Sequence, residues 1–171
     1  LGAGRQRGIA HQEAIDAGEV ILEHLADASK PETAQASPER SLVAASAHQN
    51  TGRCYEQMGR YDEALAAYAA AEKFYLALNM TEPIGDISNN RGIVLLSLGR
   101  GRDALAAFEA AASIFAQAGL ALHHAQAQIN IGDAHLLLGN YTRGLESFEQ
   151  ARRLLAPLEA LADKHVLLLD M

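Results

Sequence analysis

The sequence predicts an all-α fold: a right-handed superhelix, or α-solenoid, of stacked antiparallel helix pairs, with about seven or eight helices. Two observations support this prediction. The composition is 49% apolar and rich in Ala and Leu, with only four Pro in 171 residues, whereas Val, Ile and Thr are too sparse for a sheet. One pattern of small and aromatic residues also returns every 40 residues, and periods of about 20 to 50 residues are typical of stacked repeats.

Two glycines mark each copy of the repeat. The first glycine stands in the motif Asn-x-Gly, at Gly52, Gly92 and Gly132. The second follows seven residues later, at Gly59, Gly99 and Gly139. The second glycine is predicted to end a helix, because glycine adopts the left-handed conformation there without a Cβ penalty. The first lies inside a helix, where glycine costs about 1 kcal/mol relative to Ala, so its recurrence requires a reason.

The mid-helix glycines predict a close approach between two helices. Small residues that match them recur in the following helix at Ala64, Ala104 and Gly144. An aromatic residue recurs four positions later, at Tyr68, Phe108 and Phe148. The aromatic side chain is expected to fill the space between neighbouring hairpins. A larger side chain in place of the mid-helix glycine would then force the two helices apart.

Local signals place the helices in order. Helices are predicted over residues 9–28, 38–58, 61–78, 82–98, 102–118, 121–138 and 141–156. Ser37 as N-cap and Pro38 at the first helical position open the second of these helices. Asn79 and Gly119 end the third and the fifth. Pro157 is predicted to break the chain, so that an eighth helix begins after it.

These elements are predicted to form one domain over residues 1–171. Its parts are an N-terminal partial hairpin over 1–36 with a loop over 29–36, repeats over 37–80, 81–119 and 120–157, and a truncated repeat over 158–171. The chain begins with Leu1 rather than Met and closes on what reads as an unfinished helix. We therefore expect it to be part of a longer protein.

The order of residues in the repeat resembles a known family. Asn-x-Gly, Tyr, Gly, Tyr, Glu-Ala-Leu, Tyr and Ala follow one another in residues 50–71, and this order is similar to that of the tetratricopeptide repeat. Residues 45–158 match it three times. The unit of that family has about 34 residues. The longer unit here implies that each helix is extended by about 4.5 Å, at 1.5 Å per residue.

Repeats as long as these resemble three narrower groups. They are similar to the repeats of mitotic scaffold proteins with GoLoco motifs, to those in the sensor domain of MalT-like transcription activators, and to those that precede a caspase-like CHAT peptidase domain in large bacterial proteins. The last likeness rests on Asn-Arg-Gly at 90–92, Leu-Gly-Arg at 98–100 and Leu-Leu-Leu-Asp at 167–170.

Two positions of the second copy differ from the others. Arg91 stands where the other copies have Thr and Ile, and if it is buried it needs a partner, for which Glu82 or Asp86 is expected. Gly101 stands where the other copies have Tyr, which predicts a thinner turn at this point.

The family resemblance implies where a partner binds. The first helix of each pair lines the concave side of such a stack, and residues around the mid-helix glycine face that groove. Carried over by position, the candidates are Gln49, Asn50, Arg53, Gln57, Asp86, Asn89, Asn90, Gln126, Asn130 and Asp133. The recurring Asn has two readings: a ladder of amides that pairs with the backbone of an extended peptide, or a set of ties between one hairpin and the next.

Charge and composition argue against binding to nucleic acid or to a membrane, and against secretion. The net charge is -7 and the pI is near 5.4, so there is no positive footprint for nucleic acid or for an anionic membrane. No apolar run reaches the about 20 residues that a membrane span needs, and no secretory signal opens the chain. The single cysteine excludes an internal disulfide and agrees with a reducing, cytoplasmic location.

No residue cluster predicts catalysis, a cofactor or a metal site. His123 and His124 have no second ligand at i, i+4 spacing. Cys54, close to Gly52, reads as a small buried apolar residue rather than a nucleophile, and nothing marks His48 as its base.

Three functions remain, and in none of them is this chain itself an enzyme. The first, which the sequence favours, is an interaction module that holds a peptide or helix of another protein or of its own chain. The second is a sensor that binds a small molecule in the groove. The third is a regulatory part of a larger signalling protein, where it controls a CHAT-like peptidase or a transcription-activator domain.

Overall fold

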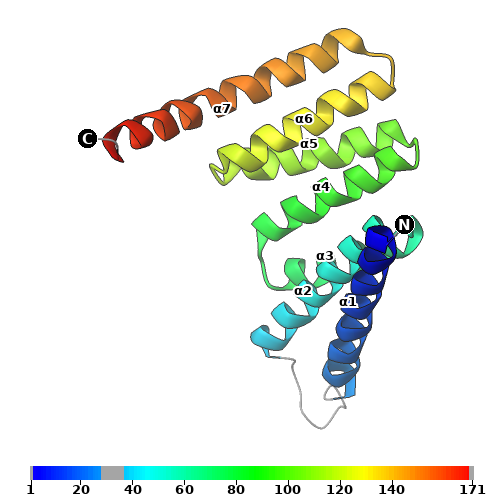
Figure 1. Cartoon of the computed structure of the whole chain (residues 1–171). Helices are drawn as coiled ribbons and strands as arrows, with labels where there is room; N and C mark the ends of the chain where they lie inside the picture. Colours follow the sequence, from blue (N-terminus) through cyan, green and yellow to red (C-terminus); the bar gives the residue numbers. More distant parts are fainter. Residues whose placement is uncertain (1, 28–36, 170–171) are drawn as a thin grey trace.

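A computed structural model of the chain describes residues 2–27 and 37–169, with side chains over 6–24 and 37–157. The described residues form seven helices and no strand, which confirms the all-α prediction. In chain order the helices are α1 (Gly2–Asp27), α2 (Pro38–Gln57), α3 (Tyr61–Ala77), α4 (Thr81–Ser97), α5 (Gly101–Gln117), α6 (Ala121–Leu137) and α7 (Tyr141–Leu169). Figure 1 shows them stacked in chain order, as in a helical-repeat superhelix.

The helices pack as three hairpins, α2 with α3, α4 with α5 and α6 with α7, while α1 packs against α2. The backbone of α4 also comes close to those of α2 and α6, whereas the backbones of α3 and α5 stay further apart within the described residues. The helices α2, α4 and α6 therefore form an inner row, and the others form an outer row. We call the exposed side of α2, α4 and α6 the inner face.

Left-handed glycines end the inner helices, as predicted. The φ angle is +73° at Gly59, +71° at Gly99 and +75° at Gly139. In the first of these turns the N–H of Arg60 donates to the carbonyl of Tyr55 at 2.8 Å, which satisfies a carbonyl that the helix end leaves free. The outer helices α3 and α5 end in the same way at Asn79 and Gly119, which also have positive φ.

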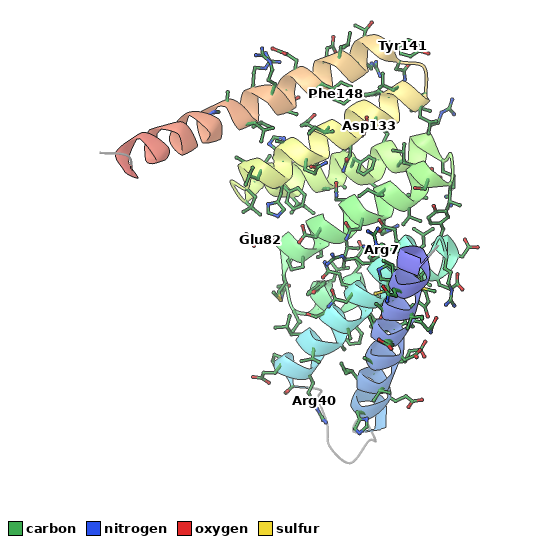
Figure 2. The ribbon with its side chains drawn as sticks, in the orientation of Figure 1. Arg7, Arg40, Glu82, Asp133, Tyr141 and Phe148 are labelled. Atoms are coloured by element: carbon green, nitrogen blue, oxygen red, sulfur yellow. The ribbon has the colours of Figure 1, made fainter. Side chains whose placement is uncertain are left out.

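The mid-helix glycines make room for an aromatic ring from the outer helix of the same hairpin. A Cβ atom added at Gly92 would lie 2.4 Å from Cε1 of Phe108. One added at Gly132 would lie 2.4 Å from Cε1 of Phe148, which projects from α7 toward α6 (Figure 2). The first hairpin has the same arrangement with Tyr68. The predicted close approach of the two helices is confirmed. The space that each mid-helix glycine leaves, here called the notch, is filled by the aromatic ring.

The small residues that were expected in the notch pack beside it instead. Ala64 and Ala104 are fully buried. A Cβ atom added at Gly144 would lie 3.3 Å from the carbonyl oxygen of Gly132. These small residues let the two helices of a hairpin come close around the ring.

Each apolar cluster joins one hairpin to the inner helix of the next. Tyr68 of α3 packs in one cluster with Val94 of α4. Phe108 of α5 packs in the other with Ile131 of α6. The same rings therefore also fill the space between neighbouring hairpins, as predicted. Packing of this kind makes stability a sum of contacts between successive repeats.

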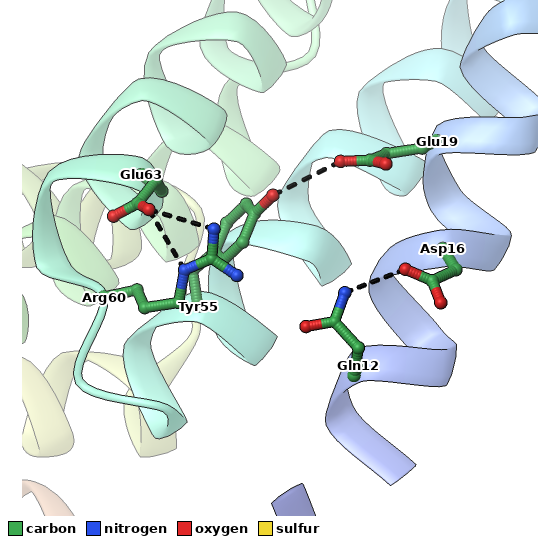
Figure 3. A network of polar contacts seen from close by, with 6 residues as sticks. All are labelled: Gln12, Asp16, Glu19, Tyr55, Arg60 and Glu63. Atoms are coloured by element: carbon green, nitrogen blue, oxygen red, sulfur yellow. Dashed lines mark hydrogen bonds and ion pairs between the residues drawn. The ribbon is translucent and has the colours of Figure 1, made fainter. Parts of the chain in front are cut away.

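The first helix is attached to the first hairpin by polar contacts and by packing. The hydroxyl of Tyr55 on α2 donates to Glu19 of α1 at 3.4 Å, and the guanidinium of Arg60 lies 4.4 Å from the centre of the Tyr55 ring (Figure 3). Arg60 also pairs with Glu63 at 3.0 Å. Exposed ion pairs contribute little, so the attachment depends mainly on buried apolar side chains such as Ile15.

The bounds of α1 differ from the prediction, because α1 begins at Gly2 rather than near residue 9. No proline interrupts this segment, and each of its glycines costs only about 1 kcal/mol in a helix, so the helix extends back to Gly2. The predicted loop over 29–36 lies outside the described residues, as do residues 170 and 171.

The predicted break at Pro157 is wrong, because α7 runs through it to Leu169 as one helix. Proline removes the hydrogen bond to the carbonyl of Arg153, four residues earlier. Pro157 and Arg153 are both exposed, so water can hydrate the carbonyl and the helix continues.

The turn before α5 is not thinner than the others. The N–H of Arg100 donates to the carbonyl of Leu95 at 2.8 Å, as in the other two turns of this kind. Gly101 is buried, and a Cβ atom added there would lie 3.1 Å from Cδ2 of Leu138. The missing side chain therefore lets the end of α6 approach α5.

Candidate functional site

The ten candidate groove residues all lie on the inner row. They are Gln49, Asn50, Arg53 and Gln57 on α2, Asp86, Asn89 and Asn90 on α4, and Gln126, Asn130 and Asp133 on α6. Because the repeat has one period, equivalent residues lie at equivalent heights on successive inner helices. Figure 2 labels Glu82 at the first turn of α4 and Asp133 on α6.

A chain of side-chain amides links α6 to α4. Nδ2 of Asn130 donates to Oδ1 of Asn89 at 2.8 Å. Nε2 of Gln126 donates to Oδ1 of Asn130 at 3.3 Å. Asn130 is only 9% exposed. Three of the candidate residues are thus brought together across two repeats.

The three recurring asparagines do not share one role. Asn130 is a tie between hairpins, which is the second of the two readings that the sequence left open. Asn50 is exposed. Asn90 is partly buried and makes no side-chain hydrogen bond with any described residue. Because a partly buried amide gains more from a partner than an exposed one, Asn90 offers donors and an acceptor that no described side chain uses.

The candidates on α2 lie away from this amide chain. Gln49 accepts a hydrogen bond of 2.9 Å from the hydroxyl of Tyr75 on α3. The other three line a cavity of about 470 Å³ between α1 and α2, whose α1 wall is apolar. Its lining includes Asn50, Arg53 and Gln57 from α2, and Ala14, Ala17, Gly18 and Ile21 from α1. The ten residues therefore form two groups, one at α1 and α2 and one at α4 and α6.

Asp86 of α4 is a partly buried carboxyl group near the amide chain. Burial raises its pKa above 3.8, and Glu82 one turn earlier raises it further, whereas His123 of α6 lowers it. His123 itself rests against the buried ring of Phe115, with ring centroids 5.2 Å apart. Asp86 forms no ion pair or side-chain hydrogen bond with the described residues. Its charge at neutral pH is therefore poorly compensated.

The partner of Arg91 is a residue that sequence reasoning missed. Its guanidinium lies 3.0 Å from the carboxylate of Glu72 on α3, so neither Glu82 nor Asp86 is its partner. The repeat contains the signal that identifies the right helix. Thr51, at the equivalent position of α2, packs against the preceding outer helix at Gly18. A residue at this position therefore faces backward in the stack, toward α3 in the case of Arg91.

The structure describes the surroundings of Cys54 and of several histidines. Cys54 is partly buried, and burial raises the pKa of its thiol, although Arg53 lowers it. A raised pKa disfavours the thiolate that a nucleophile needs. His48 stacks on Phe74 at 5.8 Å between centroids. In the part of the chain that the structure describes, no three His, Cys, Asp or Glu gather as metal ligands, and no helix is long and apolar enough to cross a bilayer.

The stack of hairpins with a shared inner row defines the class of the protein, a helical-repeat solenoid. The chain belongs to the tetratricopeptide repeat family. A profile of that repeat matches residues 84–156 and a second one matches residues 45–76, together more than half of the chain. A comparison with curated proteins gives no match.

Several solved structures share this fold at low sequence identity. BtubC (BKLC) from P. vanneervenii is 18% identical, with a TM-score of 0.74 over 88% of this chain and 58% of its own. Aspartyl phosphate phosphatase F from Bacillus subtilis is 16% identical, with a TM-score of 0.73 over 91% of this chain and 37% of its own. Repeats of a putative kinesin light chain from Podosopora anserina are 15% identical, with a TM-score of 0.63 over 90% of this chain and 74% of theirs.

These matches bear on the fold and the repeat family. The chain spans 58% and 37% of the length of the first two structures. The narrower likeness to MalT-like activators, GoLoco scaffolds or CHAT-domain proteins stays a prediction, because none of these matches tests it.

Proposed function

We propose that the chain is a protein-interaction module, without catalytic activity of its own, that holds an extended segment of another protein on its inner face. The binding surface consists of the exposed and partly buried polar residues of α4 and α6. Extended peptides bind through their backbone N–H and C=O groups, which need donors and acceptors at regular spacing.

The observation that supports this proposal is the state of Asn90. Its amide lies on the inner face with no side-chain partner among the described residues, next to Asn89, which the amide chain from α6 holds in place. A free amide offers two donors and an acceptor to a peptide backbone. Because the neighbouring side chains are fixed by their own hydrogen bonds, a peptide that binds here meets an ordered surface.

The repeat family agrees with a binding role. Tetratricopeptide stacks present extended concave surfaces of this kind. One structural neighbour is named as repeats of a putative kinesin light chain and another as an aspartyl phosphate phosphatase, and each is matched over about nine-tenths of the present chain. From the concave surface typical of the family, we infer that the present chain binds a protein segment.

Replacement of Asn90 by Ala tests the proposal. Random linear peptides displayed on phage would be selected on the whole chain, and the affinity of selected peptides would be measured by fluorescence anisotropy. We expect Asn90→Ala to weaken binding about fivefold, since a hydrogen bond contributes about 1 kcal/mol. Circular dichroism should show unchanged helix content.

Asn140→Ala is the matched control, because Asn140 is exposed in the turn before α7, away from the inner face. It should bind the selected peptides like the wild-type chain. If Asn90→Ala also binds them like the wild-type chain, or if no peptide can be selected, the proposed function is wrong.

The cavity between α1 and α2 favours a second candidate function, the sensing of a small molecule. Its volume of about 470 Å³ lies in the range of small-molecule sites, which are mostly apolar with a few polar groups. The apolar wall on α1 and the three polar candidates on α2 have that character. A ligand held there would contact both helices and so stabilise the docking of α1. Under this reading the chain regulates another domain, such as a CHAT-like peptidase or a transcription activator.

A further inference from the structure

The inner helices of the second and third repeats carry charge of one sign at their surface. Together α4 and α6 contain three carboxylates, Glu82, Asp86 and Asp133, a single arginine and no lysine. The arginine is Arg91, which is turned toward α3 and paired there with Glu72 at 3.0 Å. None of the three carboxylates forms an ion pair or side-chain hydrogen bond within the described residues. The inner face of α4 and α6 is therefore acidic.

Asp86 is the carboxylate that gains most from a cation. Its side chain is partly buried, so water solvates the charge less well than at Glu82 or Asp133, which are both exposed. The neighbouring imidazole of His123 rests on Phe115. A lysine or arginine of a ligand would supply a permanent countercharge, whereas the fold places only the imidazole of His123 near Asp86.

The residues around Asp86 could bind the backbone of an extended peptide. Asn90 lies one helical turn after Asp86 and on the same side of α4. Asn130, held by its bond to Asn89, forms the floor between α4 and α6. A basic side chain at Asp86 would therefore place the peptide backbone within reach of the amide of Asn90.

We infer that the inner face of α4 and α6 recognises an extended segment of a partner protein that carries Lys or Arg, with the cationic group seated against Asp86. This inference rests on the proposed function and states the chemistry of its partner. Complementary charge at such a surface gives selectivity and speeds association.

The position of Asp133 on α6 predicts how far apart two basic residues of the ligand should lie. Asp133 lies on the same side of α6 as Gln126 and Asn130, at offsets of seven and three residues. Position 133 of α6 is equivalent to position 93 of α4, seven residues after Asp86. Along the helix axis, seven residues span about 10.5 Å at 1.5 Å per residue. With about 10 Å between adjacent helices, the two acids lie about 14 Å apart. An extended chain covers that distance in about four residues, at about 3.3 Å each. A second basic residue is therefore expected about four positions from the first.

The experiment compares three whole chains as bait for random linear peptides on phage: wild type, Asp86→Asn and Glu109→Gln. Glu109 is exposed on the outer helix α5, so its replacement removes the same charge away from the inner face. Peptides selected on the wild type should be enriched in Lys or Arg, with a second basic residue about four positions away. Anisotropy should show that Asp86→Asn weakens their binding about tenfold and that Glu109→Gln leaves it unchanged. Added salt should weaken the wild-type complex more than the Asp86→Asn complex.

The outcomes separate this inference from the proposed function. Selected peptides that bind the Asp86→Asn chain as tightly as the wild type, or that contain no excess of basic residues, overturn the inference. If those peptides still lose affinity with Asn90→Ala, the proposed function stands. Loss of binding in Glu109→Gln as well as in Asp86→Asn means that overall charge is responsible, and this also overturns the inference. Circular dichroism of each bait shows that the helices are intact.

Discussion

A methyl group at Gly92 tests the physical role of the notch. The Cβ atom of an alanine there would lie 2.4, 2.5 and 2.8 Å from three ring carbons of Phe108. These distances are far below van der Waals contact, so the ring or the helix must move. Phe108 is completely buried among side chains of α5 and α6, and its ring has no empty space to enter.

The expected loss of stability follows from two opposing terms. Overpacking of a dense core costs about 1 to 3 kcal/mol. Replacing a helical glycine by alanine gains up to about 1 kcal/mol of helix propensity. With three close approaches on one ring, we expect the steric term to dominate. Gly92→Ala should therefore destabilise the chain by about 1 to 2 kcal/mol.

Urea unfolding followed by circular dichroism measures this loss, and Gly8→Ala is its control. Gly8 also lies inside a helix, α1, but a Cβ atom added there meets nothing within 4 Å. Gly8→Ala should be neutral or stabilising. The double variant with Phe108→Leu should recover part of the loss if the clash is its cause. A Gly92→Ala chain as stable as the wild type would refute the account of the notch.

Three further predictions concern single side chains. Asn130→Ala should cost about 1 to 2 kcal/mol in urea unfolding because two amide hydrogen bonds are lost, whereas Asn50→Ala, at an exposed position, should cost almost nothing. Arg91→Ala should lower the midpoint of unfolding by leaving Glu72 partly buried without its partner, and the additional change Glu72→Gln should recover part of the loss. Because burial raises the pKa of Asp86, its charged form destabilises the fold; Asp86→Asn should therefore melt at a higher temperature than the wild type at pH 7, and the difference should shrink below the ordinary pKa of 3.8.

Features fixed by local backbone conformation could be predicted from the sequence. Gly59, Gly99 and Gly139 adopt the left-handed conformation because glycine has no Cβ atom, and this property belongs to the residue alone. The N-cap at Ser37 was also predicted, and its hydroxyl accepts from the N–H of Arg40 at 3.4 Å. The glycines mark where helices end and Ser37 marks where one begins. The bounds of the helices could therefore be predicted from these residues.

Features that depend on exposure or on the neighbouring helix could not be predicted. A break was expected at Pro157, but Pro157 and Arg153, whose carbonyl loses its helical hydrogen bond, both lie at the surface, where water can hydrate that carbonyl. The partner of Arg91 was sought on α4 itself, although the residue faces α3. The bond between Asn130 and Asn89 joins residues of unlike position in the repeat, so a search for equivalent residues does not find it.

The two apolar clusters each end at the inner helix of the following repeat, and this has a consequence for how such a chain can change in length. Removing or duplicating one whole unit leaves the contacts at every other junction as they were. Tandem duplication and deletion of a 40-residue block therefore alter the reach of the protein without disturbing the rest of its interior. A gene of this kind can gain or lose binding sites in single steps.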